Sequence, residues 1–389
     1  MATSSGSSSI LEAETKASLD PAREGFRFLS TVFMILVIGM FFHYSASSYR
    51  SLVAEADPTA MWVKQLKGYG VGCFLFAVGY LIQPRRWIEM YWMPLWVGVV
   101  LLLLATIASP LGRELNDAYR WLDLGIRFQP SELAKFTVPA ATIALTGVLR
   151  YRGVMGRQIG VRSAVLIAAA LVGIPFYIMW KQPDFGSALF LLILGLIPLL
   201  RWTQVCFFCG VISVPLLLLL LPKVISRMGE MEQRFEAIFN PQGVPQVWAG
   251  LQAIGSGGWT GKGIGMGTSK TLYIPSEYSD FIFAVFAEET GFLGVTVLLT
   301  LYSLVLLFGW RLSRAVEDTD LACLVRVVTI AITGQAAINL LVNVALFPTK
   351  GIPLPFFSHG STGLAVFMGM TGVVIGISRT RGRQAVSLT

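Results

Sequence analysis

Long apolar runs are the feature of this sequence that most constrains its fold. A helix needs about 20 apolar residues to cross about 30 Å of hydrocarbon. We count about ten candidate spans, which run roughly over residues 27–46, 65–83, 88–108, 131–149, 163–180, 184–200, 203–222, 280–309, 322–346 and 362–378. Backbone groups inside a bilayer must be paired within helices or closed barrels, and the alternating pattern of a membrane barrel is absent. The sequence therefore predicts an all-α polytopic membrane protein, a bundle of about ten transmembrane helices.

The composition agrees with this fold class. Of 389 residues, 54% are hydrophobic and 13% are charged, whereas soluble proteins are about 25% charged. A soluble cytosolic enzyme, a disordered chain and a fibrous repeat are therefore excluded. The net charge of +8 indicates Lys and Arg in cytoplasmic loops that face anionic lipid, rather than a nucleic-acid partner.

Three segments follow from the pattern. Residues 1–26 are mostly polar and predict a flexible cytoplasmic tail, residues 27–378 form the membrane domain, and residues 379–389 form a cytoplasmic C-terminal tail. The excess of Lys and Arg in alternate short loops places both termini in the cytoplasm. Two longer connections, 109–130 and 223–279, then lie outside. The second is rich in Trp, Tyr and Gly, and we expect it to be ordered against the bundle.

Charged residues at membrane depth mark functional sites by default, and the first group lies in QPSELAKF at 129–136. Pro130 suits the first turn of a helix, and Glu132 suits its positive end. Lys135 shares a face with Glu132 and lies about 7 Å past the helix start. The group predicts either a capped helix with a local ion pair, or a lysine that has an anionic partner or lines a wet cavity.

Two further acidic residues precede candidate spans. Asp184, in KQPDFGS, and Asp280, in YSDFIF, each fit a helix cap or an active-site role. Glu288 and Glu289 lie about 12 Å deeper in the same span as Asp280. We expect these two glutamates to orient neighbouring helices rather than to reach a substrate.

The segment PTKGIPLPFFSHGST at 348–362 contains three prolines, which forbid a regular helix across it. Non-helical backbone at membrane depth lines a cavity or packs on protein. His359, one of two histidines in the chain, is more often structural than catalytic in such a setting. The glycine run at 261–267 matches neither a Walker A loop nor GxGxxG, and the histidine count argues against a zinc site.

Taken together, the motifs resemble the SEDS family (shape, elongation, division and sporulation), the RodA and FtsW type of peptidoglycan glycosyltransferase. The blocks that carry the resemblance are QPSELAKF, QPDFGSALF, GSGGWTGKGIGMGT, SDFIFAVFAEETGFLG and PTKGIPLPFFSHGST. They stand in the family's order and spacing across most of the membrane domain.

The resemblance implies an enzyme that polymerises lipid II into glycan strands at the outer face of the cytoplasmic membrane. It assigns the essential aspartate to Asp280. The supporting residues that it implies are Glu132, Lys135, Arg120, Trp121 and Asp184. Lys262 and Ser358, in two of the matching blocks, are further candidates for binding the substrate. The chain departs from the family where Tyr278-Ser279 replaces His-Thr, and where Ser358-His359-Gly360-Ser361-Thr362 replaces Ser-Tyr-Gly-Gly-Ser.

The implied reaction needs one general base for the acceptor hydroxyl, because the polyprenyl diphosphate leaves as an anion. Asp280 fits that role. The diphosphate needs positive charge, for which Lys135, Arg120 and Lys262 are candidates. No metal-ligand residues are identified, and whether a divalent cation, Mg²⁺ or Mn²⁺, accompanies the diphosphate is left open.

Two other functions fit the same helices and charges: a lipid II flippase and a non-catalytic divisome scaffold. The clustering of the motifs on the outer side favours the enzyme. The resemblance also implies a class B penicillin-binding protein as partner, together with other divisome or elongasome membrane proteins. PTKG at 348–351 and the polar N-terminal tail favour the division type.

Overall fold

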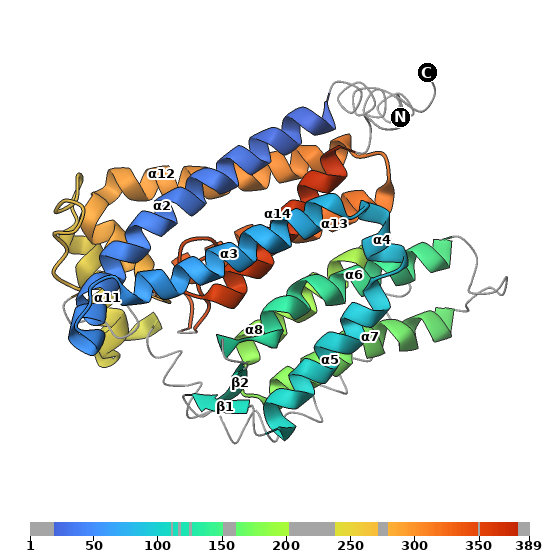
Figure 1. Cartoon of the computed structure of the whole chain (residues 1–389), viewed down its shortest axis with the longest axis horizontal. Helices are drawn as coiled ribbons and strands as arrows, with labels where there is room; N and C mark the ends of the chain where they lie inside the picture. The colour runs from blue at the N-terminus through green and yellow to red at the C-terminus, as the bar shows by residue number, and fades with distance from the viewer. Residues whose placement is uncertain are drawn as a thin grey trace.

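The computed structural model describes residues 19–109, 112–115, 118–123, 127–150, 161–201, 238–270, 279–348 and 351–379 (Figure 1). The α-helices are α2 (Pro21–Glu55), α3 (Ala60–Leu81), α4 (Pro84–Glu89), α5 (Trp92–Ala108), α6 (Pro130–Arg150), α7 (Val161–Lys181), α8 (Phe185–Leu196), α11 (Pro245–Ser256), α12 (Ile282–Ala315), α13 (Thr319–Asn343) and α14 (Ser361–Ser378). Two short 3₁₀ helices, η2 (Ile197–Arg201) and η3 (Pro241–Gly243), and three strands, β1 (Gly112–Leu115), β2 (Ala118–Asp123) and β3 (Arg127–Phe128), complete the described part.

The polytopic all-α membrane fold that the sequence predicts is confirmed. Among the described residues, five helices are long and apolar enough to cross a membrane, namely α2, α7, α12, α13 and α14. Helix α5 and the stretch from α8 into η2 are shorter and apolar, and α3 and α6 coincide with two more of the predicted spans. The predicted span 203–222 lies outside the described residues.

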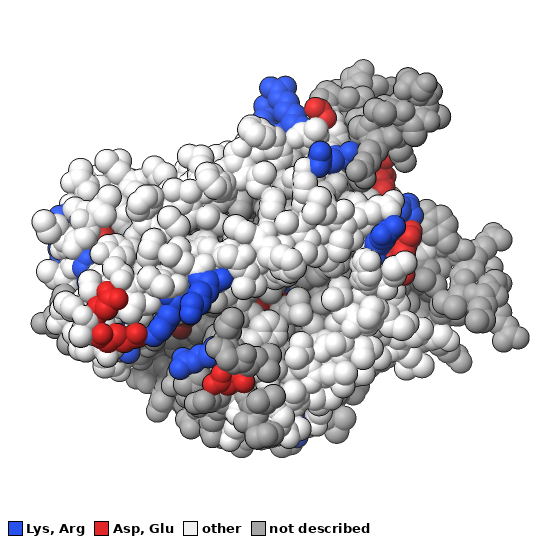
Figure 2. Space-filling view, in the orientation of Figure 1, with Lys and Arg blue, Asp and Glu red and all other residues white. Residues whose placement is uncertain are grey.

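The surface is that of a protein surrounded by hydrocarbon. Large apolar side chains are exposed along the helices, among them Phe33 of α2, Phe74 of α3, Leu101 of α5 and Val297 of α12. Most of the face shown in Figure 2 is uncharged, and its charged side chains gather in a few patches near the edges. In water such a surface would be an aggregation hazard, whereas in lipid it is the expected one.

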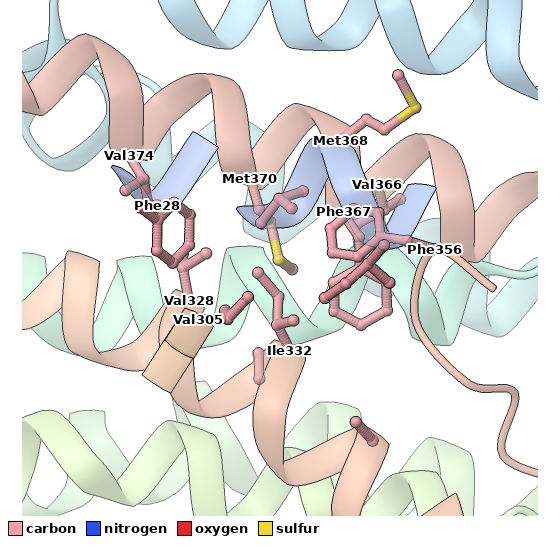
Figure 3. Close-up of a cluster of buried hydrophobic side chains, with 14 of the residues drawn as sticks. Phe28, Val305, Val328, Ile332, Phe356, Val366, Phe367, Met368, Met370 and Val374 are labelled. Atoms are coloured by element: carbon pink, nitrogen blue, oxygen red, sulfur yellow. The ribbon is translucent and has the colours of Figure 1, made fainter. Parts of the chain in front are cut away.

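Two sets of helices build the bundle (Figure 1). In one, α2, α3, α12, α13 and α14 pack on one another; in the other, α5, α6, α7 and α8 do. Helix α6 joins the sets, since it also contacts α13 and α14. The largest core cluster fills the space between α2, α12, α13 and α14 with side chains such as Phe28, Val305, Ile332 and Phe367 (Figure 3).

Helices α3 and α14 approach closely because small residues line their contact. A Cβ on Gly72 would meet Met368 Sδ at 2.4 Å, and one on Gly372 would meet the carbonyl oxygen of Phe76 at 2.2 Å. Gly68 and Gly72 form a GxxxG pair in α3, as do Gly372 and Gly376 in α14. Such pairs let helix backbones come together in membranes, where apolar surface alone gives little drive to associate.

The connection between α5 and α6 contains a small antiparallel sheet that the sequence analysis did not predict. Its order is β1-β2-β3, with Trp121 opposite Arg113 and Leu122 opposite Phe128. The sheet carries Arg120 and Trp121 on β2 and leads directly into α6. It therefore fixes two of the candidate residues beside the start of that helix.

Helix α12 is broken at Gly291, whose φ of 66° and ψ of −165° are not helical. A neighbouring segment of the long outer connection pairs with the backbone at the break. The N–H groups of Lys262 and Gly263 donate to the carbonyls of Glu288 and Glu289, and those of Phe292 and Leu293 donate to the carbonyls of Gly258 and Trp259. Backbone groups freed inside a membrane protein need such partners.

The side chains of Glu288 and Glu289 hold the same segment, as predicted for residues that orient neighbouring elements. Glu288 pairs with Lys262 at 2.6 Å and accepts from the N–H groups of Thr268 and Ser269. Glu289 pairs with Lys270 at 2.8 Å and accepts from Ser45 Oγ of α2. The described part of the long connection, 238–270, is therefore ordered against the bundle, as expected.

Replacing Gly291 by Ala should destabilise the protein. An added Cβ would lie 2.3 Å from the Gly261 nitrogen, at a positive φ that side chains disfavour. Strain of this kind costs about 1–3 kcal/mol, so the melting temperature in detergent should fall by several degrees. The matched control is Gly98→Ala in α5, where a Cβ meets nothing within 4 Å. Equal melting temperatures for the two variants would contradict this account of the break.

Candidate active site

The four motifs singled out from the sequence lie at one end of the bundle, as predicted. At the other end, a Cβ on Gly25 of α2 would touch Ser378 of α14, and Arg85 pairs with Asp318 at 2.6 Å. At the motif end, Thr362 Oγ1 accepts from the N–H of Gln129 and donates to the carbonyl of Arg127. The starts of α6 and α14 are thereby joined beside the candidate residues.

Asp280 lies just before α12 and is half-buried. No side chain among the described residues donates a hydrogen bond or pairs ionically with its carboxylate. A Cβ on Gly351 would lie 3.0 Å from its Oδ2, so the proline-rich segment passes directly beside the carboxylate. Burial raises the pKa of Asp280 to about 7, and the positive charge of Arg120 opposes that shift.

Arg120 connects the small sheet to the start of α8. Its Nη2 donates to the carbonyl of Pro183 at 2.7 Å, and its Nη1 lies 3.9 Å from Asp184 Oδ1. Asp184 stands at the N-cap position of α8, but its side chain makes no capping hydrogen bond. Asp184 Oδ2 and Arg120 Nε are both buried without a hydrogen-bond partner among the described residues. Asp184 Oδ2 can therefore accept, and Arg120 Nε can donate, one further hydrogen bond.

Lys135 is deeply buried, and its charge is already compensated. Its Nζ pairs with Glu132 Oε1 at 2.7 Å and donates to Gln335 Oε1 of α13 at 2.6 Å. Both sequence alternatives thus hold in part: the local ion pair is present, and the lysine has an anionic partner. Glu132 compensates the charge of Lys135 in this arrangement, and Arg120 is the cation whose charge lowers the pKa of Asp280 against the effect of burial.

Two other candidates, Ser358 and Lys262, contact other parts of the chain. Ser358 is buried, and its hydroxyl accepts from the N–H of Leu354 inside the proline-rich turn. Lys262, in its ion pair with Glu288, fixes the glycine-rich segment to α12. Each side chain therefore has a contact within the chain, and its role toward a substrate stays a prediction. Trp121 is half-buried on β2 next to Arg120.

Sequence reasoning missed three residues of α13 that contact the site. Gln335, Asn339 and Asn343 are each buried, with at most 1% of their surface exposed. Both asparagines donate to the carbonyl of Asp280, at 2.9 and 3.0 Å. Their spacing of four places them on one helix face. Amides repeated at that interval in an apolar helix are the signal that would have found them.

The two histidines of the chain meet. Nε2 of His43 in α2 lies 2.9 Å from Nδ1 of His359, and the rings stack with centroids 5.0 Å apart. The contact ties the end of the proline-rich segment to α2. It agrees with the structural role that the sequence favoured for His359.

Among the described residues there is no group of three or more His, Cys, Asp or Glu side chains that could hold a metal ion. No step of the reaction proposed below runs through a metal ion.

Comparison with known proteins identifies the family. A family model described as a cell cycle protein, covering FtsW, RodA and SpoVE, matches residues 26–383. A probable peptidoglycan glycosyltransferase FtsW from Thiomicrospira cyclica is 35% identical over 359 residues, 89% of each chain. The protein of the same description from Trichlorobacter lovleyi is 30% identical over 362 residues, 90% of this chain and 92% of the relative.

Solved structures agree with that assignment. A chain from a study of how a peptidoglycan synthase complex coordinates polymerisation and crosslinking is 25% identical, with a TM-score of 0.68, and the match covers 91% of this chain and 97% of that one. The rod shape determining protein RodA of Thermus thermophilus is also 25% identical, with a TM-score of 0.64 and the same coverage. The chain therefore belongs to the FtsW, RodA and SpoVE family of cell cycle proteins.

Proposed function

We propose that this protein is a peptidoglycan glycosyltransferase that polymerises lipid II at the outer face of the bacterial cytoplasmic membrane, with Asp280 as the general base. The observation that carries the proposal is the half-buried carboxylate of Asp280, which no described side chain pairs with, beside Arg120 and the proline-rich segment. The relatives named above carry the same enzyme class in their descriptions.

The chemistry follows from the protonation state of Asp280. A base works best when its pKa is close to the working pH, and burial brings this carboxyl to about 7. The carboxylate takes the proton of the acceptor sugar hydroxyl while that oxygen attacks the anomeric carbon of the donor. The bond from the anomeric carbon to the diphosphate oxygen breaks, and the polyprenyl diphosphate leaves as an anion.

Arg120 is the side chain best placed to meet the leaving diphosphate. It is half-buried, reaches the start of α8, and has a buried Nε without a partner among the described residues. Guanidinium groups bind phosphate oxygens through paired hydrogen bonds. Asp184 holds the guanidinium from the other side, so we assign it a supporting role. The buried Glu132–Lys135 pair supports the helix that forms the wall of the site.

Two rival functions lead to different observations. A lipid II flippase needs polar residues along a path through the membrane, and vesicles containing it would translocate lipid II without making glycan. The candidate residues gather at one end of the bundle instead, which favours chemistry at a surface. A scaffold has no need of a carboxylate with a raised pKa next to an arginine.

The cellular setting is a further part of the proposal. We place both termini in the cytoplasm, since the start of α2 and the end of α14 lie at the end opposite Asp280. We infer a class B penicillin-binding protein as partner, because one structural neighbour comes from a complex that joins polymerisation to crosslinking. The many similar FtsW proteins favour the division machinery over the elongation machinery.

The variant Asp280→Asn should abolish polymerisation of labelled lipid II while the protein stays folded. The amide keeps the shape of the side chain but cannot accept the hydroxyl proton, and loss of a general base typically costs about 10²–10⁴-fold in rate. The measurement is gel-resolved glycan made by purified protein, with melting temperature as the folding control. Wild-type product from the variant would remove Asp280 from this role.

Activity should rise with pH through about 7, since the base must be ionised and the pKa of Asp280 is about 7. In Arg120→Gln the attraction that favours the carboxylate is lost, so the pKa rises and the acidic limb of the rate profile moves to higher pH. The exposed Arg86, next to the α3–α4 connection at the other end of the bundle, provides the control variant Arg86→Gln. An acidic limb that stays in place in Arg120→Gln contradicts the assignment.

A further inference from the structure

The buried amides of α13 have orientations that chemistry determines. Lys135 Nζ can only donate, so it is Gln335 Oε1 that accepts its hydrogen bond. Gln335 Nε2 then donates to the carbonyl of Pro353 at 2.9 Å. Asn339 Nδ2 donates to two carbonyls, those of Asp280 at 2.9 Å and Ile352 at 2.8 Å. Carbonyls only accept, so flipping either amide would break these bonds.

Asn339 thus uses both hydrogens of its amide to join two non-helical segments. One segment is the turn that carries Asp280 into α12, and the other is the proline-rich segment at Ile352. These two segments face each other across the carboxylate, because Gly351 lies directly beside Asp280 Oδ2. The distance between them is therefore set by one side chain of α13.

Asn343 provides a second hydrogen-bond donor to the Asp280 carbonyl. Its Nδ2 donates to the carbonyl of Asp280 at 3.0 Å and to the carbonyl of Asn339 at 2.9 Å. One turn before Asn339 in α13, Gln335 contacts Lys135 and Pro353. The row of amides is anchored at both ends to elements of the site.

We propose that Asn339 and Asn343 are positioning residues for Asp280, which hold its main chain at a fixed place relative to the proline-rich segment and Arg120. This inference rests on the proposed function, since it assumes that Asp280 acts in the reaction. It adds two residues that act through another residue rather than on the substrate.

A purely structural role would need only one donor for a buried carbonyl. Asn339 and Asn343 both donate to the Asp280 carbonyl, and Asn339 also donates to the carbonyl of Ile352 in the proline-rich segment. Small displacements of a reacting group have large effects on rate. The arrangement therefore controls how Asp280 lies, in addition to satisfying buried polar groups.

The test compares Asn343→Ala, Asn339→Leu and the matched control Thr333→Val. Asn343→Ala is the milder change, because the Asp280 carbonyl keeps the Asn339 donor. Thr333 is on the same helix, and its hydroxyl donates to the carbonyl of Thr329 within α13. For each purified variant, kcat and KM for lipid II polymerisation, the pH profile and the melting temperature are measured, with Asp280→Asn in the same assay.

We expect kcat to fall about 10-fold or more in Asn339→Leu and several-fold in Asn343→Ala, with KM changed less than about 2-fold. The acidic limb of the pH–rate profile should shift in both asparagine variants, because the surroundings of Asp280 change. Thr333→Val should behave as wild type. Should Asn339→Leu fail to fold, Asn343→Ala decides alone.

Wild-type kcat and an unmoved acidic limb in folded Asn343→Ala would overturn the inference. Loss of activity only in proportion to lost folded protein would overturn it as well. The proposed function fails separately: wild-type protein that makes no glycan, or an active Asp280→Asn variant, would refute it whatever the asparagine variants do.

Discussion

Irregular backbone inside an apolar helix bundle must find hydrogen-bond partners, and this requirement shapes the motif end of the protein. Two stretches leave helical geometry there, the break in α12 at Gly291 and the proline-rich segment before α14. The first is paired by the backbone of the glycine-rich segment, and the second by amides of α13. An unpaired buried carbonyl or amide costs several kcal/mol in hydrocarbon, of the order of 2–7 kcal/mol. These polar side chains are therefore part of the fold as well as of the site.

Most buried charges at the motif end are paired with an opposite charge, and the carboxylate of Asp280, which we propose acts in the reaction, is not. Lys135, Lys262 and Lys270 are each matched by a buried glutamate. Asp280 alone among the singled-out carboxylates has no ionic or hydrogen-bonding partner on a described side chain, and its pKa is raised accordingly. A carboxylate in that condition can take a proton near neutral pH, which a paired one cannot do as readily.

Much of this arrangement could be predicted from the sequence, and the rest depended on distant contacts. Apolar runs predicted the helices, since length and composition alone decide whether a segment spans a membrane. Asp280, Asp184 and Arg120 do gather at one end. Lys135 pairs with Glu132, as their spacing of three predicts, but its second partner Gln335 lies 200 residues away, and no local pattern indicates that contact. The contacts of Ser358 with Leu354 and of Lys262 with Glu288 likewise depend on the fold and have no local signal in the sequence. The small sheet escaped because its strands are too short for an alternating pattern to be recognised.

The central claim is that the half-buried Asp280 lies at the outer end of the bundle, with the start of α2 and the end of α14 at the inner end. Site-directed labelling tests it most directly, in a chain whose Cys73, Cys206, Cys209 and Cys323 are replaced by Ala. Asp280→Cys should react with a membrane-impermeant maleimide in intact spheroplasts, whereas Asp318→Cys, at the other end of α12, should react only after permeabilisation. Reaction at position 280 only after permeabilisation, or protection under both conditions, would contradict the account.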